Sequence, residues 1–170
     1  DESHPVLTNV TINNNTSTLG PAAIEINDNS DPVFNDAMIS YNTNTGNFHG
    51  VIYIDAGGSS PTFNDVVISY NDGGGIYCYN CTQQDNDILT LNNVIVSNNT
   101  AVEGAGIYIN IANLSLNNVI ISNNTAVTDA GLSILECSDV TISNVTISDN
   151  VSTWGSALYL QYTDAILENV

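Results

Sequence analysis

The residues best suited to chemistry in this sequence are two closely spaced cysteines. Cys78 and Cys81 form a C-x-x-C motif at the end of an expected strand, 75–78. A thioredoxin-like motif would open a helix, and a zinc site would need two further ligands nearby. The sequence offers neither. A local Cys78–Cys81 disulfide and two free structural thiols therefore both remain open.

The carboxylates are the second candidate group. The chain has 18 Asp and Glu residues, no Lys or Arg, and a formal net charge of -18. Paired carboxylates can perform general acid–base catalysis, but most of these residues fall in expected turns and form no cluster on one face. Solvated turn carboxylates are the simpler explanation. We assign no catalytic residue and no cofactor, and we keep Ca²⁺ as a candidate counter-ion.

The charge balance limits the partners of the chain. Binding to nucleic acid depends on Lys and Arg contacts to phosphate, and this sequence has none. Anionic membrane surfaces are disfavoured for the same reason, and no apolar stretch is long enough to cross a bilayer. We therefore expect neither nucleic-acid binding nor membrane insertion.

Asn-x-Ser/Thr sequons are more frequent than chance. In a glycosylating cell they would be acceptors for N-linked glycans, which implies an extracellular or cell-surface location. The predicted sites are Asn98, Asn123, Asn113, Asn144, Asn80, Asn9 and Asn14. Asn15 and Asn150 also head sequons, but we expect them to be less accessible.

An internal repeat must position all of these residues. Segment 89–109 is followed by a close copy, 114–134, and a small apolar anchor recurs about every 25 to 29 residues. The anchors are Val10, Ala37, Val66, Val94, Val119, Val145 and Val170. Large apolar residues stand three positions before each anchor: Leu7, Phe34, Phe63, Leu91, Leu116, Ile142 and Leu167.

Each repeat contains three short segments with strand periodicity. In one repeat they are 88–91, 94–97 and 106–109, and the segment NNTAVEGA (98–105) is expected to be a longer turn. Apolar residues alternate with polar ones or Tyr, β-branched residues dominate, and helical spacing is absent. The pattern predicts an all-β, single-stranded parallel β-helix of about six coils, with residues 1–170 forming one domain.

Asn recurs five positions after each anchor, at Asn15, Asn42, Asn71, Asn99, Asn124 and Asn150. Identical residues in successive coils stack, so we interpret this column as an internal ladder of amides that also bonds the backbone of the corner. The alternative is that Asn serves only as a turn former. The same stacking puts Cys137 two coils from Cys81, beyond disulfide reach.

Tyrosine forms a second column, at Tyr53, Tyr77, Tyr108 and Tyr159. The flanking residues are expected to point inward, so these side chains should point outward. A stacked aromatic row could bind sugar rings or pack against another fibre. Alternatively, Tyr simply suits an outer strand face.

The pattern of Ile or Val, Ser, any residue and Asn, followed by a Gly-rich turn and strand, resembles known repeats. Clear examples are Ile68–Asn71 with Gly73–Ile76, and Val96–Asn99 with Gly104–Ile107. They are similar to the right-handed β-helix repeats of pectin-lyase-like proteins and of polymorphic outer-membrane proteins. That resemblance implies a right-handed coil. Enzymes of this kind use Arg or Lys, which this chain lacks, so we expect no enzymatic activity.

The segment 165–170 matches 5–10, so the sequence begins and stops at the same phase of the coil. Neither end shows a capping helix, which solenoids need to cover their core. The chain is then either part of a longer array or stacks head to tail. We predict a structural extracellular β-solenoid glycoprotein that forms or extends a surface fibre. The alternatives are a carbohydrate-binding or adhesin module using the Tyr row and acidic turns, with or without calcium, and an atypical polysaccharide-active enzyme.

Overall fold

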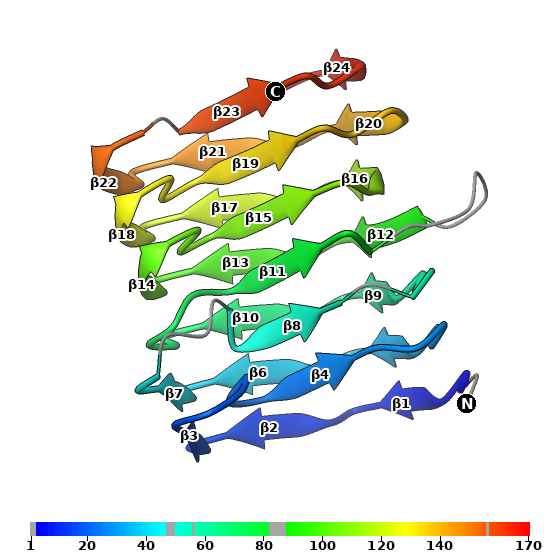
Figure 1. Cartoon of the computed structure of the whole chain (residues 1–170), viewed down its shortest axis with the longest axis vertical. Coiled ribbons are helices and arrows are strands. Elements are labelled where there is room, and N and C mark those ends of the chain that lie inside the picture. Colours follow the sequence, from blue (N-terminus) through cyan, green and yellow to red (C-terminus); the bar gives the residue numbers. More distant parts are fainter. Residues whose placement is uncertain (1–2, 47–49, 56, 82–87, 156) are drawn as a thin grey trace.

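The computed structural model describes residues 3–46, 50–55, 57–81, 88–155 and 157–170. Within these residues every regular element is a β-strand, and the strands are wound into stacked turns (Figure 1). All strand pairs are parallel and join equivalent positions of successive repeats, as in Leu7 with Phe34 and Leu91 with Leu116. The predicted all-β parallel solenoid of about six turns is confirmed.

The first sheet contains the strands that precede each anchor residue. Its seven strands are β1 (Val6–Thr8), β5 (Val33–Asn35), β9 (Thr62–Asn64), β12 (Ile88–Asn92), β16 (Asn113–Asn117), β20 (Val140–Ser143) and β24 (Ala165–Glu168). Leu89 and Leu91 point into the coil and are fully buried, whereas Thr90 between them faces outward. This alternation is the side-chain period of a strand with one buried face.

The second and third sheets have six strands each. The second contains β2 (Thr11–Asn13), β6 (Met38–Ser40), β10 (Val67–Ser69), β13 (Ile95–Ser97), β17 (Ile120–Ser122) and β21 (Thr146–Ser148). The third contains β4 (Ile24–Ile26), β8 (Ile52–Ile54), β11 (Ile76–Tyr79), β15 (Ile107–Asn110), β19 (Leu132–Leu135) and β23 (Leu158–Gln161). The first sheet therefore has one strand more than the other two.

A fourth, short strand lies in the segment that we expected to be a turn. These strands are β3 (Thr16–Ser17), β7 (Thr43–Asn44), β14 (Thr100–Glu103), β18 (Thr125–Thr128) and β22 (Val151–Trp154). Asp72 forms single β-bridges with Thr43 of β7 and Thr100 of β14, and so links the pair β3–β7 to the three strands β14, β18 and β22. Small side chains pack where these strands approach the third sheet, including buried Ala105 and Ala130. The expectation of three strands per coil was wrong here, because turns that stack in register pair like strands.

Single residues in the left-handed conformation turn the chain at the corners. The first corner, between the first and second sheets, has positive φ at Asn9, Asp36, Asp65, Asn93, Asn118, Asn144 and Asn169. The second corner, after the second sheet, has it at Asn14, Tyr41, Tyr70, Asn98, Asn123 and Asp149. The third corner, after the third sheet, includes Asn80, Ile111, Glu136 and Tyr162. Asn and Asp tolerate this conformation best, which explains why they dominate the first corner.

The inward faces of the three main sheets form one apolar core along the coil axis. It consists mainly of Ile, Leu and Val, with Phe34 and Phe63 stacked at a ring distance of 5.0 Å. Each inward residue lies on its equivalent in the next coil, so apolar residues form continuous columns along the core. The described residues form no helix that could span a membrane.

Candidate functional site

The six predicted ladder asparagines lie one above another, immediately after the second corner. Asn42, Asn71, Asn99 and Asn124 are buried. In each step the backbone N–H and the Nδ2 of one Asn donate to Oδ1 of the next, for example from Asn71 to Asn99 at 3.0 Å each. The column is therefore a continuous chain of amide hydrogen bonds.

From the second coil upward, each ladder Nδ2 also bonds the backbone of the coil below. Asn99 Nδ2 donates to the Ile68 carbonyl at 3.1 Å, and Asn124 Nδ2 donates to that of Val96 at 3.0 Å. The ladder thus satisfies backbone groups that a sharp buried corner would otherwise leave unpaired. Its arrangement is structural, since the amides bond one another rather than opening onto solvent.

The tyrosine column is stacked but largely covered. The rings of Tyr53 and Tyr77 lie 5.9 Å apart and those of Tyr77 and Tyr108 lie 4.6 Å apart, with nearly parallel planes. Tyr77 is only 9% exposed. Buried Ser133 occupies the column above Tyr108 and separates it from Tyr159.

Turns cover this row, and glycine stands where each turn comes closest to a tyrosine side chain. A Cβ on Gly50 would lie 2.6 Å from the Tyr77 Cβ, and one on Gly104 would lie 2.7 Å from the Tyr108 Cβ. Both glycines also have positive φ, so a side chain is excluded there on two grounds. The ring faces contact each other and the turns, so little aromatic surface is left for a sugar to stack on.

Burial raises the pKa of the phenols in this row. The pKa of Tyr77 is raised far above its usual value, mainly by burial and then by the neighbouring Tyr108 and Glu103. Burial likewise raises the pKa of Tyr53 and Tyr108, and nearby carboxylates add to the effect. These hydroxyls are neutral at physiological pH.

A second tyrosine pair, which sequence reasoning missed, lies exposed on the second corner. Tyr41 and Tyr70 stack with ring centroids 5.2 Å apart and planes within 5°. An open groove of about 440 Å³ runs beside them, lined by Asn13, Asn14, Met38, Ser40, Tyr41, Ser69 and Tyr70. The available signal was the S-Y-N sequence at 40–42 and 69–71, where later coils have S-N-N or S-D-N.

The predicted glycosylation sites differ in accessibility. Asn9, Asn14, Asn123 and Asn144 are exposed at corners, and Asn80 and Asn98 are half-buried at corners. Asn113 lies instead within β16 and is 7% exposed, and its Oδ1 accepts a hydrogen bond from Ser138 Oγ at 3.3 Å. We do not propose a glycan at Asn113, because its amide is enclosed by neighbouring strands.

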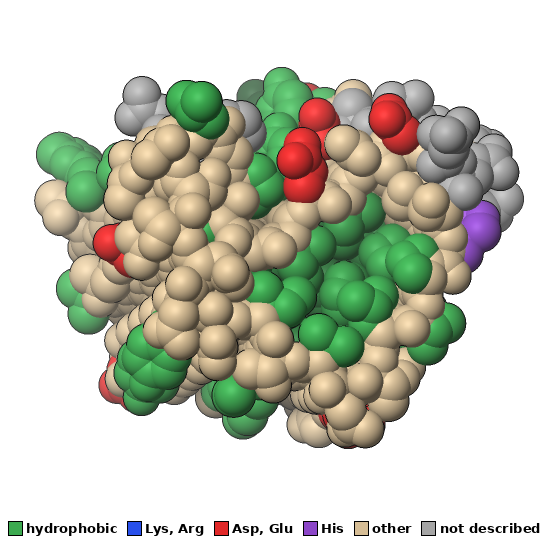
Figure 2. All heavy atoms as spheres, turned by 90° about the horizontal axis from the view of Figure 1, so that it is seen from below, with side chains coloured by type: hydrophobic (Ala, Val, Ile, Leu, Met, Phe, Trp, Pro, Cys, Tyr) green, Lys and Arg blue, Asp and Glu red, His purple; other side chains and the backbone are tan. Residues whose placement is uncertain are grey.

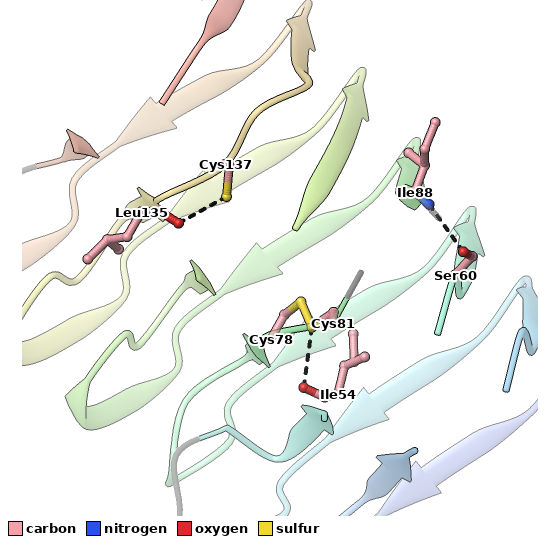
Figure 3. Close-up of a disulfide and its surroundings, with 7 residues drawn as sticks. All are labelled: Ile54, Ser60, Cys78, Cys81, Ile88, Leu135 and Cys137. Atoms are coloured by element: carbon pink, nitrogen blue, oxygen red, sulfur yellow. Dashed lines mark hydrogen bonds between the residues drawn. A yellow bond between two sulfur atoms is a disulfide. The ribbon is translucent and has the colours of Figure 1, made fainter. Parts of the chain in front are cut away.

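The cysteines lie at the third corner (Figure 3). A disulfide joins Cys78 to Cys81 across the left-handed Asn80, with their Cα atoms 5.9 Å apart. Cys137 is a buried free thiol that donates to the Leu135 carbonyl at 3.1 Å, and burial raises its pKa. Tyr79 pairs with Asn110 and Asn110 with Leu135, which puts Cys81 and Cys137 two coils apart.

The carboxylates do not gather into a site in the described part of the chain. No group of three or more His, Cys, Asp or Glu side chains there could hold a metal ion. Exposed His4 lies with Nδ1 3.2 Å from Asp31 Oδ2. His49 and the acidic residues Asp85 and Asp87 lie outside the described residues.

The lower end of the coil is open. Figure 2 looks onto this end and shows apolar side chains at the bottom of a hollow framed by polar atoms. A cavity of about 260 Å³ lies there, lined in part by Leu7, Ile24, Ile26 and Phe34. At the upper end, Leu160 and Leu167 are 40% exposed. Among the described residues, the strands of the first and last coils pair with a neighbour on one side, around an apolar cross-section.

Comparison with protein families agrees with this geometry. The model described as "Right handed beta helix region" matches residues 50–170. Comparisons with curated proteins and with solved structures gave no match. The family match covers more than half of the sequence and coincides with the stacked coils, so the chain belongs to the right-handed β-helix family.

Proposed function

We propose that this chain is a structural β-solenoid of an extracellular glycoprotein, which forms or extends a surface fibre by stacking end to end on a second copy. The observation that carries the proposal is the in-register stacking of equivalent residues through the described coils, from Leu7 on Phe34 to Ile142 on Leu167. A further copy can continue such a stack, because the edge of a strand is a template for another strand. The proposal assigns no enzymatic activity to the chain.

The two ends are complementary in their hydrogen bonding. In the ladder, each asparagine offers Oδ1 to the coil below and donates to the coil above. Among the described residues, no ladder asparagine lies below Asn15 or above Asn150. Asn150 of one copy could therefore donate to Asn15 of the next, and Leu158 could pack on Ile24 of the next copy.

The extra strand of the first sheet determines how two copies can meet. If β2 and β4 of an upper copy pair with β21 and β23 of a lower one, its β1 occupies the level of β24. One of these two strands must then be released. Stacking in full register therefore requires the displacement of β24 or of β1.

Charge opposes this assembly. The chain carries a formal net charge of -18, with no Lys or Arg to pair across an interface. Salt screens such repulsion over a Debye length of about 8 Å at physiological ionic strength. Glycans on the exposed Asn9, Asn123 and Asn144 would add bulk on the sides of the rod while leaving its ends free.

Sedimentation velocity tests the proposal at several salt concentrations. The full chain should assemble more as salt rises, and a chain ending at Asp164 should assemble at a lower concentration, because it lacks β24. Ile12→Asp, in the lower apolar cross-section, should block both, whereas Thr11→Asp on the outward side of the same strand should not. Monomers for both chain lengths at every salt concentration would contradict the proposal.

The alternative carbohydrate-binding function has less support. It relied on an outward row from Tyr53 to Tyr159. Three of its rings stack on one another, and glycine-containing turns pack against Tyr77 and Tyr108. Tyr41 and Tyr70 form an exposed aromatic stack elsewhere, on the second corner.

A further inference from the structure

The Tyr41–Tyr70 stack lies back over the outer face of the second sheet. Tyr41 and Tyr70 are 56% and 53% exposed, yet the preceding Ser40 and Ser69 are only 2% and 7% exposed. In later coils the equivalent serine is followed by Asn or Asp instead of Tyr, and it is half-buried, as at Ser97. The rings therefore cover the serines and keep their own outer surface in solvent.

The position of these tyrosines is unfavourable for the backbone. Both have φ of 56°, in the left-handed region, where bulky residues are uncommon and Asn is preferred. Asn fills the equivalent corner position in the coils on either side, at Asn14 and Asn98. The aromatic pair is thus a local exception in a column otherwise composed of Asn and Asp.

Each end of the aromatic stack faces an asparagine of a sequon. Asn14 lies one coil below Tyr41 and Asn98 one coil above Tyr70, and Thr16 and Thr100 complete the two sequons. Coils are about 4.8 Å apart, which is close to the stacking distance of two flat rings. A sugar joined to Nδ2 of Asn14 or Asn98 would leave the corner in the same direction as the tyrosine side chain.

We propose that the Tyr41–Tyr70 stack holds the first N-acetylglucosamine of N-linked glycans at Asn14 and Asn98, one on each free ring face. The inference rests on the proposed glycoprotein. The C–H face of a pyranose buries apolar surface when it packs on an aromatic ring. The groove beside Tyr41 has room for a sugar, since its volume of about 440 Å³ is in the usual range of small-ligand sites, roughly 300–1,000 Å³. Asn14, Met38 and Ser40 line it.

The chain contains a matched control for this interaction. Asn98 and Asn123 both begin the sequence N-N-T-A-V, and their φ angles are 57° and 56°. The residue below Asn98 in the corner column is Tyr70, whereas the residue below Asn123 is Asn98 itself. Any difference between glycans at these two sites therefore reports mainly on the aromatic ring.

The test uses the full chain secreted from a glycosylating host, with site occupancy measured by mass spectrometry of glycopeptides. Asn98→Gln and Asn123→Gln are each made in the natural background and in the Tyr70→Ser background. Every variant is also produced in bacteria, without glycans, so that the effect of the substitution itself on Tm can be subtracted. The glycan at Asn98 should raise Tm by roughly 2–4 °C more than that at Asn123, and Tyr70→Ser should abolish this difference. In NMR spectra the Asn98 sugar protons should show a ring-current shift that the Asn123 sugar lacks.

Equal contributions from two occupied sites would overturn the inference, as would occupancy of Asn123 but not of Asn98. Titration of N,N′-diacetylchitobiose into the bacterial protein gives a further check, because micromolar binding that requires Tyr41 and Tyr70 would instead assign the stack to an external sugar and overturn our assignment. None of these readouts depends on assembly, so their failure is distinct from failure of the proposed fibre. A chain without any glycan would refute both the glycoprotein and this inference.

Discussion

The asparagine ladder at the second corner and the asparagine-rich column of the first corner repeat similar residues once per coil. In the ladder, buried Asn99 accepts two hydrogen bonds from Asn71 and its Nδ2 donates two more. In the first corner, exposed Asn118 donates one side-chain bond to Asn93 at 2.7 Å. The two columns differ in burial and in the number of bonds each amide makes.

This difference separates two uses of one residue type. In the first corner Asn is selected for its tolerance of positive φ, and water can replace its side-chain bonds. In the ladder the amide replaces water around buried backbone groups, so its loss leaves donors and acceptors unpaired. Stability should therefore depend strongly on the ladder and weakly on the outer column.

Removal of a central ladder amide should give the largest effect. Asn99→Ala leaves the backbone N–H of Asn71 and the carbonyl of Ile68 without their partners. At about 1–3 kcal/mol for each buried unpaired group, we expect a loss of about 3–5 kcal/mol in the free energy of unfolding. Urea unfolding followed by circular dichroism measures it, and a loss below ~1 kcal/mol would remove the distinction between the two columns.

Alkaline pH should lower the free energy of unfolding through the covered tyrosine row. Because the folded-state pKa of Tyr77 is raised, the folded protein holds this proton more tightly than the unfolded chain does. Its contribution is complete below pH ~10 and falls as pH rises further, by up to about 1.4 kcal/mol per pH unit. Unfolding measured from pH 9 to 11 should be less pH-dependent in Tyr77→Phe. An unchanged slope would show that Tyr77 ionises as freely as an exposed phenol.

Backbone strain at the third corner gives a smaller and opposite effect. Ile111 has φ of 53°, which a β-branched residue rarely adopts, while the equivalent residue one coil below is Asn80. Ile111→Asn should raise the free energy of unfolding by about 1 kcal/mol. The converse change, Asn118→Ile at the first corner, should lower it by a similar amount. If both substitutions are neutral in thermal unfolding, left-handed geometry does not select Asn at these corners.

The exposed amide column should give the smallest effect. Asn118→Gly keeps the left-handed conformation accessible and removes only the solvent-exposed bond to Asn93. We expect a change within about 0.5 kcal/mol in urea unfolding. A loss comparable to that of Asn99→Ala would contradict the contrast between the buried and exposed columns.

Most of the fold could be predicted because residues that stack in successive coils recur at regular spacing in the sequence. The spacing of Leu91 and Leu116 relative to their anchors corresponds to the observed strand register. Such regularity arises because each coil buries the same face against the next. The position of the asparagine ladder follows from the same logic.

The remaining features depend on tertiary packing that no single repeat reveals. The turn around Gly104 covers Tyr108, so outward direction did not mean exposure. Asn113 heads a sequon, yet it pairs with Ile88 inside β16 and is enclosed by neighbouring strands. Tyr41 and Tyr70 occupy a left-handed corner that their residue type disfavours, so propensity could not locate their stack.

Electron microscopy of the purified full chain, at high protein concentration and physiological or higher salt, tests the proposed fibre most directly. Six coils at about 4.8 Å each predict filaments in which copies repeat about every 30 Å along the axis. Axial strand spacing continuous across copies would show that the coils stack in register. Monodisperse particles of single-chain size under all of these conditions would contradict the proposal.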